Sequence, residues 1–247
     1  MKIFLTGGTG FLGSIFYELL KNKHNIYVLT RNKKKNYPNF IFGNLNDEFK
    51  ILSDCKVLVH FAAHGVTPKK STLKKCIEVN VIQTMKLLNQ AADQGISKFI
   101  VIGTSQEYGD LADQGSRVDV FSKLSPNTNY AKSKVVSYKK IENFCKRRNV
   151  RVSYLRVFNT YGEGQNKSSL FCNILDSIKS GEPIVLRNPN KKIDIIQAKL
   201  AISKISKYLN FNGIRKGRIK VVNIGSGRTI KVVDFVNKMT NKYKKNK

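Results

Sequence analysis

A tyrosine and a lysine that can move a proton together, Tyr130 and Lys134, lie four positions apart in a segment whose composition predicts a helix. At this spacing both side chains leave the same helical face, one turn apart. An unperturbed tyrosine loses its proton at about pH 10. An ammonium group about 4 Å away favours the phenolate by roughly 4 kcal/mol, which is about three pK units. The pair therefore predicts a tyrosine acid with a lowered pKa, provided that the preceding elements build a site around it.

A glycine-rich turn, Gly7 to Gly13, stands between a predicted buried strand at residues 2–5 and an apolar-periodic helix that continues to Leu20. Glycine permits a tight turn and close approach to a pyrophosphate, and the following helix offers its free N–H groups to the anion. The spacing is G-x-x-G-x-x-G. The turn predicts a dinucleotide site, and the alternative is a glycine turn without a ligand.

The second predicted strand, residues 25–29, ends in Thr30 and Arg31. Folds that prefer NAD place an acidic side chain here to hold the ribose 2′-hydroxyl, whereas an arginine accommodates a 2′-phosphate. Because no acidic residue is present and Lys33, Lys34 and Lys35 follow, we expect NADP(H) as the cofactor. The alternative is that Arg31 is an ordinary basic surface residue.

Strands alternate with helices along the chain, which predicts a doubly wound parallel α/β sheet. Further strands are expected at residues 40–42, 57–59, 98–102 and 152–157, with a long helix at residues 71–94. Thr104 and Ser105 follow a strand end, where such sheets bind ligands. Asn80 in the long helix indicates a cofactor-side or loop-bracing bond, or simple exposure. His60 and His64 are expected to be structural, because no acidic or metal-binding partner accompanies them.

The 247-residue chain carries a formal net charge of +29, which normally favours nucleic acid, anionic membranes or anionic substrates. The lysines are spread along the sequence, as a general residue bias would also produce, so we expect no nucleic-acid partner. Its four cysteines lack metal-site spacing and are expected to be buried thiols. Without a signal peptide or a long apolar run, the sequence predicts a soluble cytoplasmic protein and no membrane partner.

Seven motifs, in the expected order, resemble the extended short-chain dehydrogenase/reductase family. More narrowly, they resemble its NAD(P)-dependent epimerase/dehydratase branch, which acts on nucleotide-linked sugars. The motifs are Gly7 to Gly13, His60-Phe61-Ala62-Ala63, Asn80, Thr104 to Gly109, Tyr130-x-x-x-Lys134, Leu155 to Gly162 and Asn223 to Gly227. The resemblance implies a Rossmann-type NADP-binding domain at residues 1–160, which also takes in residues 192–210. A small C-terminal substrate-binding lobe would interleave with it at residues 161–247.

The resemblance also implies roles for individual residues. Tyr130 matches the catalytic acid/base, Lys134 the residue that lowers its pKa and holds the nicotinamide ribose, and Thr104 the group that hydrogen-bonds the reacting oxygen, with Ser105 as its alternative. The implied cofactor contacts are Gly7, Thr9, Gly10, Phe11, Leu12, Gly13, Thr30, Arg31, Asn44, Leu45, Phe61, Ala62, Ala63, Asn80, Tyr130 and Lys134. The implied substrate contacts are Ser105, Gln106, Asn159 and Arg187. No metal is expected, and a homodimer would fit the family.

Departures from the family pattern narrow the expected chemistry. Sugar 4,6-dehydratases follow the catalytic Thr with a pair containing acidic side chains, but this sequence has Ser105 and Gln106. An amide cannot serve as a general acid at neutral pH. Dehydration is therefore not expected. The segment Gly103 to Gly109 and the strand end Thr30-Arg31 resemble those of reductases of 4-keto-6-deoxy sugar nucleotides. This resemblance implies NADPH-dependent reduction of the C4 keto group of a nucleotide-linked 4-keto-6-deoxy sugar, in deoxysugar biosynthesis for surface polysaccharide. The alternatives are an epimerase of this family, or a non-catalytic member that senses NADP or binds nucleic acid.

Overall fold

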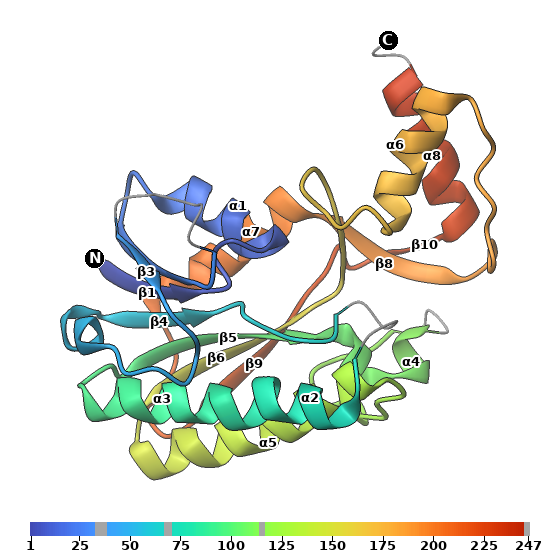
Figure 1. Ribbon diagram of the computed structural model, residues 1–247. Helices are drawn as coiled ribbons and strands as arrows, with labels where there is room; N and C mark the ends of the chain where they lie inside the picture. The colour runs from blue at the N-terminus through green and yellow to red at the C-terminus, as the bar shows by residue number, and fades with distance from the viewer. Residues whose placement is uncertain (33–38, 67–70, 114–116, 245–247) are drawn as a thin grey trace.

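A seven-stranded parallel sheet organises the chain in the computed structural model, which describes residues 1–32, 39–66, 71–113 and 117–244 (Figure 1). Its strand order is β3-β2-β1-β4-β5-β6-β9. The strands are β1 (Lys2–Thr6), β2 (Asn25–Thr30), β3 (Phe40–Phe42), β4 (Val57–His60), β5 (Lys98–Thr104), β6 (Arg151–Val157) and β9 (Ile219–Ile224). Parallel strands bring their carboxyl ends to one edge, so the motifs that follow β1, β4 and β5 share that edge.

Helices cover both faces of this sheet, as the continuously apolar central strands require. One face is covered by α1 (Phe11–Leu20) and α7 (Ala198–Ser206), and the other by α2 (Leu73–Ile77), α3 (Thr84–Asp93) and α5 (Asn129–Arg148) (Figure 1). Two separate hydrophobic clusters fill the spaces between the sheet and these two helix layers. The predicted Rossmann-type doubly wound fold is confirmed.

The long predicted helix at residues 71–94 is interrupted in the structure. Between α2 and α3 lies a π-helical segment, η3 (Glu78–Gln83), which contains Asn80. Thr84 donates its side-chain hydroxyl to the carbonyl of Val79, within this segment. Single π-helical turns inside helices frequently occur at functional sites, because the wider turn re-aims one side chain.

A small three-stranded sheet stands apart from the large one, with strand order β10-β8-β7 (Figure 1). It consists of β7 (Asn159–Tyr161), β8 (Lys192–Gln197) and β10 (Thr229–Lys231), and it carries α6 (Leu170–Ser180) and α8 (Val232–Lys244). Phe171, Ile174 and Phe235 form the centre of its own core. The division at residue 160 stays a prediction. Of the elements that follow residue 160, β9 lies in the large sheet and α7 contributes to the core of that sheet, whereas β8 lies in the small sheet.

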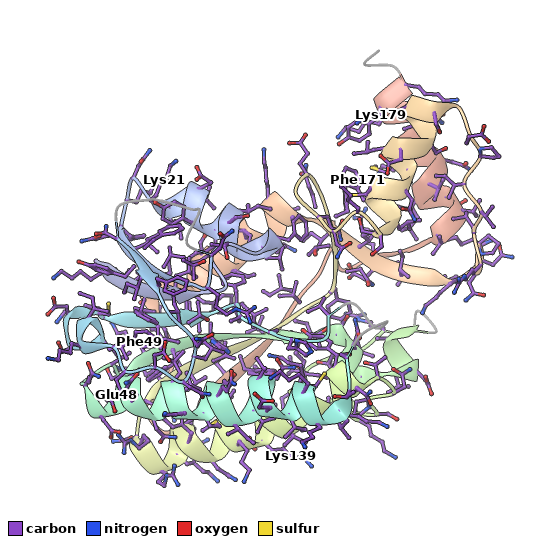
Figure 2. All side chains as sticks on the ribbon, in the orientation of Figure 1. Lys21, Glu48, Phe49, Lys139, Phe171 and Lys179 are labelled. Atoms are coloured by element: carbon purple, nitrogen blue, oxygen red, sulfur yellow. The ribbon has the colours of Figure 1, made fainter. Side chains whose placement is uncertain are left out.

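The remaining short elements are 3-10 turns and one short helix, namely η1 (Lys50–Asp54), η4 (Ser105–Tyr108), α4 (Asp110–Asp113) and η5 (Lys207–Asn210). Three of the four free cysteines are buried, whereas Cys172, near the start of α6, is only half-buried. Figure 2 shows that exposed lysines such as Lys21, Lys139 and Lys179 lie in separate parts of the molecule. None of the described helices is long and apolar enough to cross a membrane.

Candidate functional site

The glycine turn after β1 is packed too closely for side chains. Gly7 has a φ of +72°, and a Cβ there would lie 2.6 Å from the backbone nitrogen of Ala62. A Cβ on Gly13 would lie 2.1 Å from the carbonyl oxygen of Gly7. Gly10 precedes α1 without any side-chain cap, so the first N–H groups of that helix face outward. Thr9, Phe11 and Leu12 are half-buried around them. This cradle fits the pyrophosphate of a dinucleotide.

The end of β2 contains no carboxylate. Thr30 is buried and accepts a hydrogen bond from the backbone N–H of Asn32, while Arg31 is exposed beside it. Lys33, Lys34 and Lys35, which were expected to add positive charge, lie outside the described residues. Asn44 follows β3 and is exposed, and its neighbour Leu45 is half-buried. Among the described residues, no acidic side chain pairs with Arg31, which stands at the strand end where NAD and NADP sites differ.

Asn80 braces the segment that follows β4. Its side-chain oxygen accepts from the backbone N–H of His64 at 2.7 Å, and its amide nitrogen donates to His64 O and to the Ser133 hydroxyl. Ser133 in turn donates to the carbonyl of Tyr130. Both amide protons of Asn80 are thus used in bracing, which is one of the roles that the sequence left open. Phe61, Ala62 and Ala63 precede His64 and are half-buried or exposed.

His60 holds the end of β4 in place. It lies between the hydroxyls of Thr6 and Thr84, at 2.7 Å and 2.9 Å from its two ring nitrogens. Burial, with a smaller contribution from the nearby Lys134 ammonium, lowers the pKa of His60 to about 3. His60 therefore stays neutral and structural, as the sequence predicted.

Thr104 ends β5 and caps the turn η4. Its backbone N–H donates to the Glu107 carboxylate at 3.0 Å, and its hydroxyl oxygen accepts from the backbone N–H of Gln106 at 3.3 Å. This reciprocal capping box fixes the orientation of the Thr104 side chain. Ser105, the alternative for the same role, is buried to a similar extent. The Gln106 side-chain oxygen accepts from the hydroxyl of Thr128, the residue that caps α5.

Tyr130 and Lys134 lie in the first turns of α5, and both are buried. Burial raises the pKa of Tyr130 above its ordinary value, and the Glu107 carboxylate raises it further. Burial also lowers the pKa of Lys134 to about 8, against a smaller raising effect of Glu107. The lowered tyrosine pKa predicted from the spacing is thus wrong. Burial disfavours the charged phenolate, and Lys134 is not among the groups that shift the pKa of Tyr130. Tyr130 therefore remains a protonated donor at neutral pH.

A fully buried ion pair, which the sequence analysis missed, lies behind Thr104. The second Glu107 oxygen accepts from Arg156 at 2.8 Å, and both side chains are at most 2% exposed. The first Glu107 oxygen also accepts from the Tyr154 hydroxyl, which lies 3.3 Å from the carbonyl of Lys134. The Arg156 guanidinium lies 4.9 Å from the ring centre of Tyr108. Arg156, a charged residue among the buried residues of β6, was the available signal, since a buried charge needs a partner.

The predicted substrate contacts do not all gather at this site. Asn159 begins β7, is exposed, and donates to the backbone carbonyl of Asp194 at 3.2 Å. The Asp194 carboxylate accepts from the backbone N–H groups of Ser226 and Gly227, so it organises the turn after β9. Arg187 is exposed in the segment between α6 and β8. Within the described residues, no hydrogen bond or ion pair joins Arg187 to Thr104 or Tyr130.

Residues 3–225 match the sequence profile of the NAD dependent epimerase/dehydratase family. The chain belongs to that family. One relative of this family member is low-salt glycan biosynthesis protein Agl12 of Haloferax volcanii, which is 25% identical over 92% of this chain and 77% of its own length. Another is dTDP-D-glucose 4,6-dehydratase of Mus musculus, also 25% identical, over 96% of this chain and 72% of its own length. The resemblance to nucleotide-sugar enzymes of the extended short-chain type is confirmed.

Solved structures share the fold of this family member. MoeE5 in complex with UDP-glucose and NAD superposes with a TM-score of 0.82 at 22% identity, over 98% of this chain and 82% of MoeE5. UDP-N-acetylglucosamine 4-epimerase from Methanobrevibacter ruminantium M1 superposes with a TM-score of 0.84 at 20% identity, over 97% of this chain and 81% of the epimerase. RMD from Pseudomonas aeruginosa, complexed with NADPH, superposes with a TM-score of 0.78 at 21% identity, over 97% of this chain and 81% of RMD. Neighbours in fold therefore bind either NAD or NADPH.

We predict that Glu107→Gln lowers the free energy of unfolding by about 3–5 kcal/mol, because it leaves Arg156 as an uncompensated buried charge. The double variant Glu107→Gln/Arg156→Met removes both charges and should recover most of that loss. Urea unfolding measures both. The control is Glu78→Gln, which breaks the exposed pair with Lys75 and should cost less than about 1 kcal/mol. Equal effects of Glu107→Gln and Glu78→Gln would contradict this account of the pair.

We also predict that Lys134→Met raises the melting temperature at neutral pH. The folded wild type holds a proton on buried Lys134 at a cost, since its pKa there is about 8 against 10.5 for an ordinary lysine. The unfolded chain binds more protons between these values, so wild-type stability rises with pH across that window. The advantage of Lys134→Met should therefore shrink between pH 8 and 10.5. Calorimetry at several pH values tests this, and an advantage that does not change with pH contradicts it.

Proposed function

We propose that this protein reduces the C4 keto group of a nucleotide-linked 4-keto-6-deoxy sugar with NADPH. The observation that carries the proposal is the site composition at the carboxyl edge of the sheet. A fixed hydroxyl (Thr104), a protonated tyrosine (Tyr130) and a lysine (Lys134) are present, and an amide, Gln106, occupies the place where sugar dehydratases keep an acid. Such a set can protonate an alkoxide and lacks the acid needed to expel water.

The residues divide the proton chemistry between them. When bound, NADPH supplies the hydride. Tyr130 donates its proton to the oxygen that develops negative charge, and its raised pKa keeps that proton in place until then. The Thr104 hydroxyl hydrogen-bonds the same oxygen, and its capping contacts hold it in one orientation. Lys134 holds the ribose of the cofactor.

The end of β2 favours NADPH over NADH in this proposal. Arg31 is exposed beside Thr30, and no carboxylate stands there to accept bonds from a ribose 2′-hydroxyl. An arginine at this position can pair with a 2′-phosphate. The remaining cofactor contacts in the proposal are those expected from sequence, with Asn80 acting through the braced segment at His64 rather than by a free amide.

An epimerase is the second candidate. Among proteins with this fold, MoeE5 was solved with UDP-glucose and NAD, and a UDP-N-acetylglucosamine 4-epimerase superposes equally well. An epimerase would keep NAD bound and show no net reduction. The position of Arg31 at the end of β2 weighs against this candidate.

The proposal extends to the surroundings of the reaction. The small lobe, with Asn159 and Arg187, would bind the nucleotide sugar together with Ser105 and Gln106. The product would serve deoxysugar and polysaccharide biosynthesis in the cytoplasm, and the protein would act as a homodimer without a metal or nucleic acid.

We predict that the protein oxidises NADPH when it receives one of the dTDP-, CDP-, GDP- or UDP-linked 4-keto-6-deoxyhexoses. The loss of NADPH absorbance measures this reaction. Tyr130→Phe should slow turnover by about 10²–10⁴-fold, because the proton donor is lost while the ring still fills its site. Tyr138→Phe, in the same helix, is the matched control and should turn over like the wild type. No oxidation with any of the four sugars would exclude the reductase. Tightly bound NAD without net reduction would instead favour the epimerase.

We predict that Arg31→Asp shifts the cofactor preference from NADPH toward NADH by at least about tenfold in kcat/KM, or by at least about 1.4 kcal/mol. The aspartate would repel a 2′-phosphate and accept bonds from a 2′-hydroxyl. Steady-state kinetics with both cofactors measure the ratio. The charge-matched control Lys21→Asp, at the exposed residue that follows α1, should leave the ratio unchanged. An unchanged ratio in Arg31→Asp would remove Arg31 from the proposed cofactor site.

A further inference from the structure

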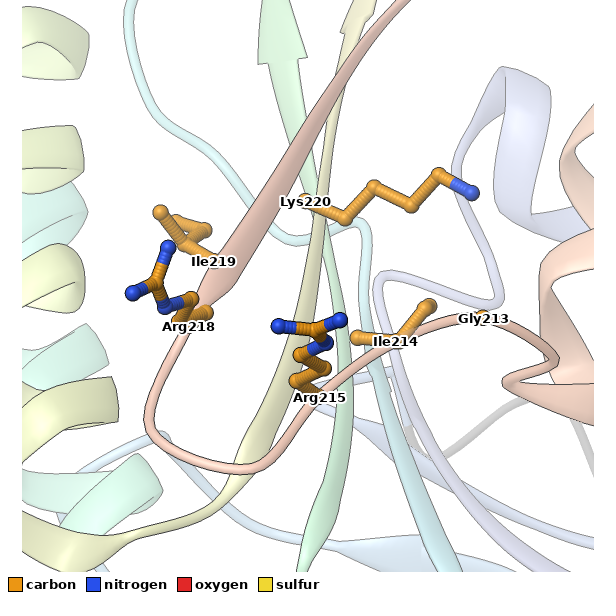
Figure 3. Close-up of a pocket in the computed structure, with 6 residues that line it drawn as sticks. All are labelled: Gly213, Ile214, Arg215, Arg218, Ile219 and Lys220. Atoms are coloured by element: carbon orange, nitrogen blue, oxygen red, sulfur yellow. The ribbon is translucent and has the colours of Figure 1, made fainter.

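A basic hollow lies around the residues that lead into β9 (Figure 3). Its volume is about 340 Å³, and three of its six lining residues are cationic while none is acidic. The lining residues are Gly213, Ile214, Arg215, Arg218, Ile219 and Lys220. Because β9 runs parallel to β5 and β6, its first residues lie at the amino edge of the sheet, away from the candidate site. This volume suits a small-molecule ligand.

The sheet register concentrates positive charge at this edge. Lys98, the first residue of β5, pairs with Arg151, the first residue of β6. Val152 of β6 pairs with Ile219, the first residue of β9, and Arg218 directly precedes that strand. Like charges opposite one another on neighbouring strands are destabilising, and a bound anion would relieve that repulsion. Arg151 of this pair contacts the lining of the hollow, because it donates to the carbonyl of Ile214.

The loop that carries the hollow is anchored to the rest of the protein by burial and by hydrogen bonds. Phe211 and Ile214 are buried anchors, and Arg151 donates to the carbonyl of Ile214 at 3.0 Å. Gly217, with a φ of +71°, forms a turn, and its N–H donates to the carbonyl of Val150 just after α5. A pre-ordered loop loses less entropy on binding.

Arg215 and Arg218 are the principal cations of the hollow. They flank the turn at Gly217, and the backbone N–H of Arg218 lies 3.4 Å from the carbonyl oxygen of Arg215. Figure 3 shows both guanidinium groups at this turn, whereas the Lys220 ammonium extends away from Arg218. Neither arginine takes part in an ion pair among the described residues, unlike Arg148 and Arg156. Guanidinium groups bind phosphate oxygens through paired hydrogen bonds.

From these observations we infer that the hollow at residues 213–220 binds the di- or triphosphate group of a small phosphorylated ligand. The inference is independent of the proposed reductase activity, because the hollow lies at the opposite end of β5, β6 and β9. It gives part of the positive charge of the chain a defined role.

Calorimetric titration with inorganic tripolyphosphate tests the inference, and the arginine variant described next separates binding at the hollow from binding at the glycine turn. Arg215→Gln/Arg218→Gln should lose this binding event or weaken its Kd by at least about tenfold. Lys139→Gln/Lys140→Gln removes the same charge from the exposed face of α5 and should bind like the wild type. Equal weakening in both double variants, or no binding by the wild type, would overturn the inference.

A second titration distinguishes a small phosphorylated ligand from a nucleic acid. Single-stranded DNA oligonucleotides of increasing length replace tripolyphosphate in the same variants. A small-ligand site predicts affinity that does not rise with length. Affinity that rises with length, and that falls in Arg215→Gln/Arg218→Gln, would identify a nucleic-acid surface and overturn the assignment to a small ligand.

Discussion

The buried ion pair between Glu107 and Arg156 connects the parts of the protein on which the candidate site depends. One carboxylate oxygen caps the Thr104 turn and accepts from Tyr154, and the other holds the guanidinium. Arg156 also donates to the Tyr108 hydroxyl, which donates in turn to Asn223 on β9. A network of this kind is favourable only when every member is satisfied, because each unpaired buried charge costs far more than one hydrogen bond contributes. The position of Thr104 in the candidate site therefore depends on a buried hydrogen-bond network within the largely apolar sheet.

Burial decides the acid–base properties of the site. Tyr130 and Lys134 were expected to act on each other as a simple charge pair, yet the loss of water around both dominates. It makes the tyrosine a weaker acid and the lysine a weaker base, which suits a tyrosine that must keep its proton until an alkoxide forms. Glu107 opposes the loss of charge on Lys134, so the same carboxylate that orders Thr104 also affects both reactive groups.

The fold was largely predictable because its signals are local. The order of strands and helices, the glycine turn and the helix containing Tyr130 follow from periodicity and spacing, and the structure lengthens strands such as β5 by only one or two residues. Less could be foreseen where distant segments meet. Asn80, in the π-helical segment, bonds to His64 and Ser133, and the sequence indicates these contacts only through a polar residue in a predicted helix.

By itself the sequence determined the parallel α/β fold and which reactive side chains follow which strands, because these depend on neighbouring residues. Only the tertiary structure decided their state. It set the direction of the Tyr130 pKa, gave Glu107 its partner 49 positions away, and aligned Lys98 with Arg151 in one row of cations. The physical reason is that burial and strand register bring together residues from distant parts of the chain. Neither can be predicted from the spacing of residues that are close in sequence.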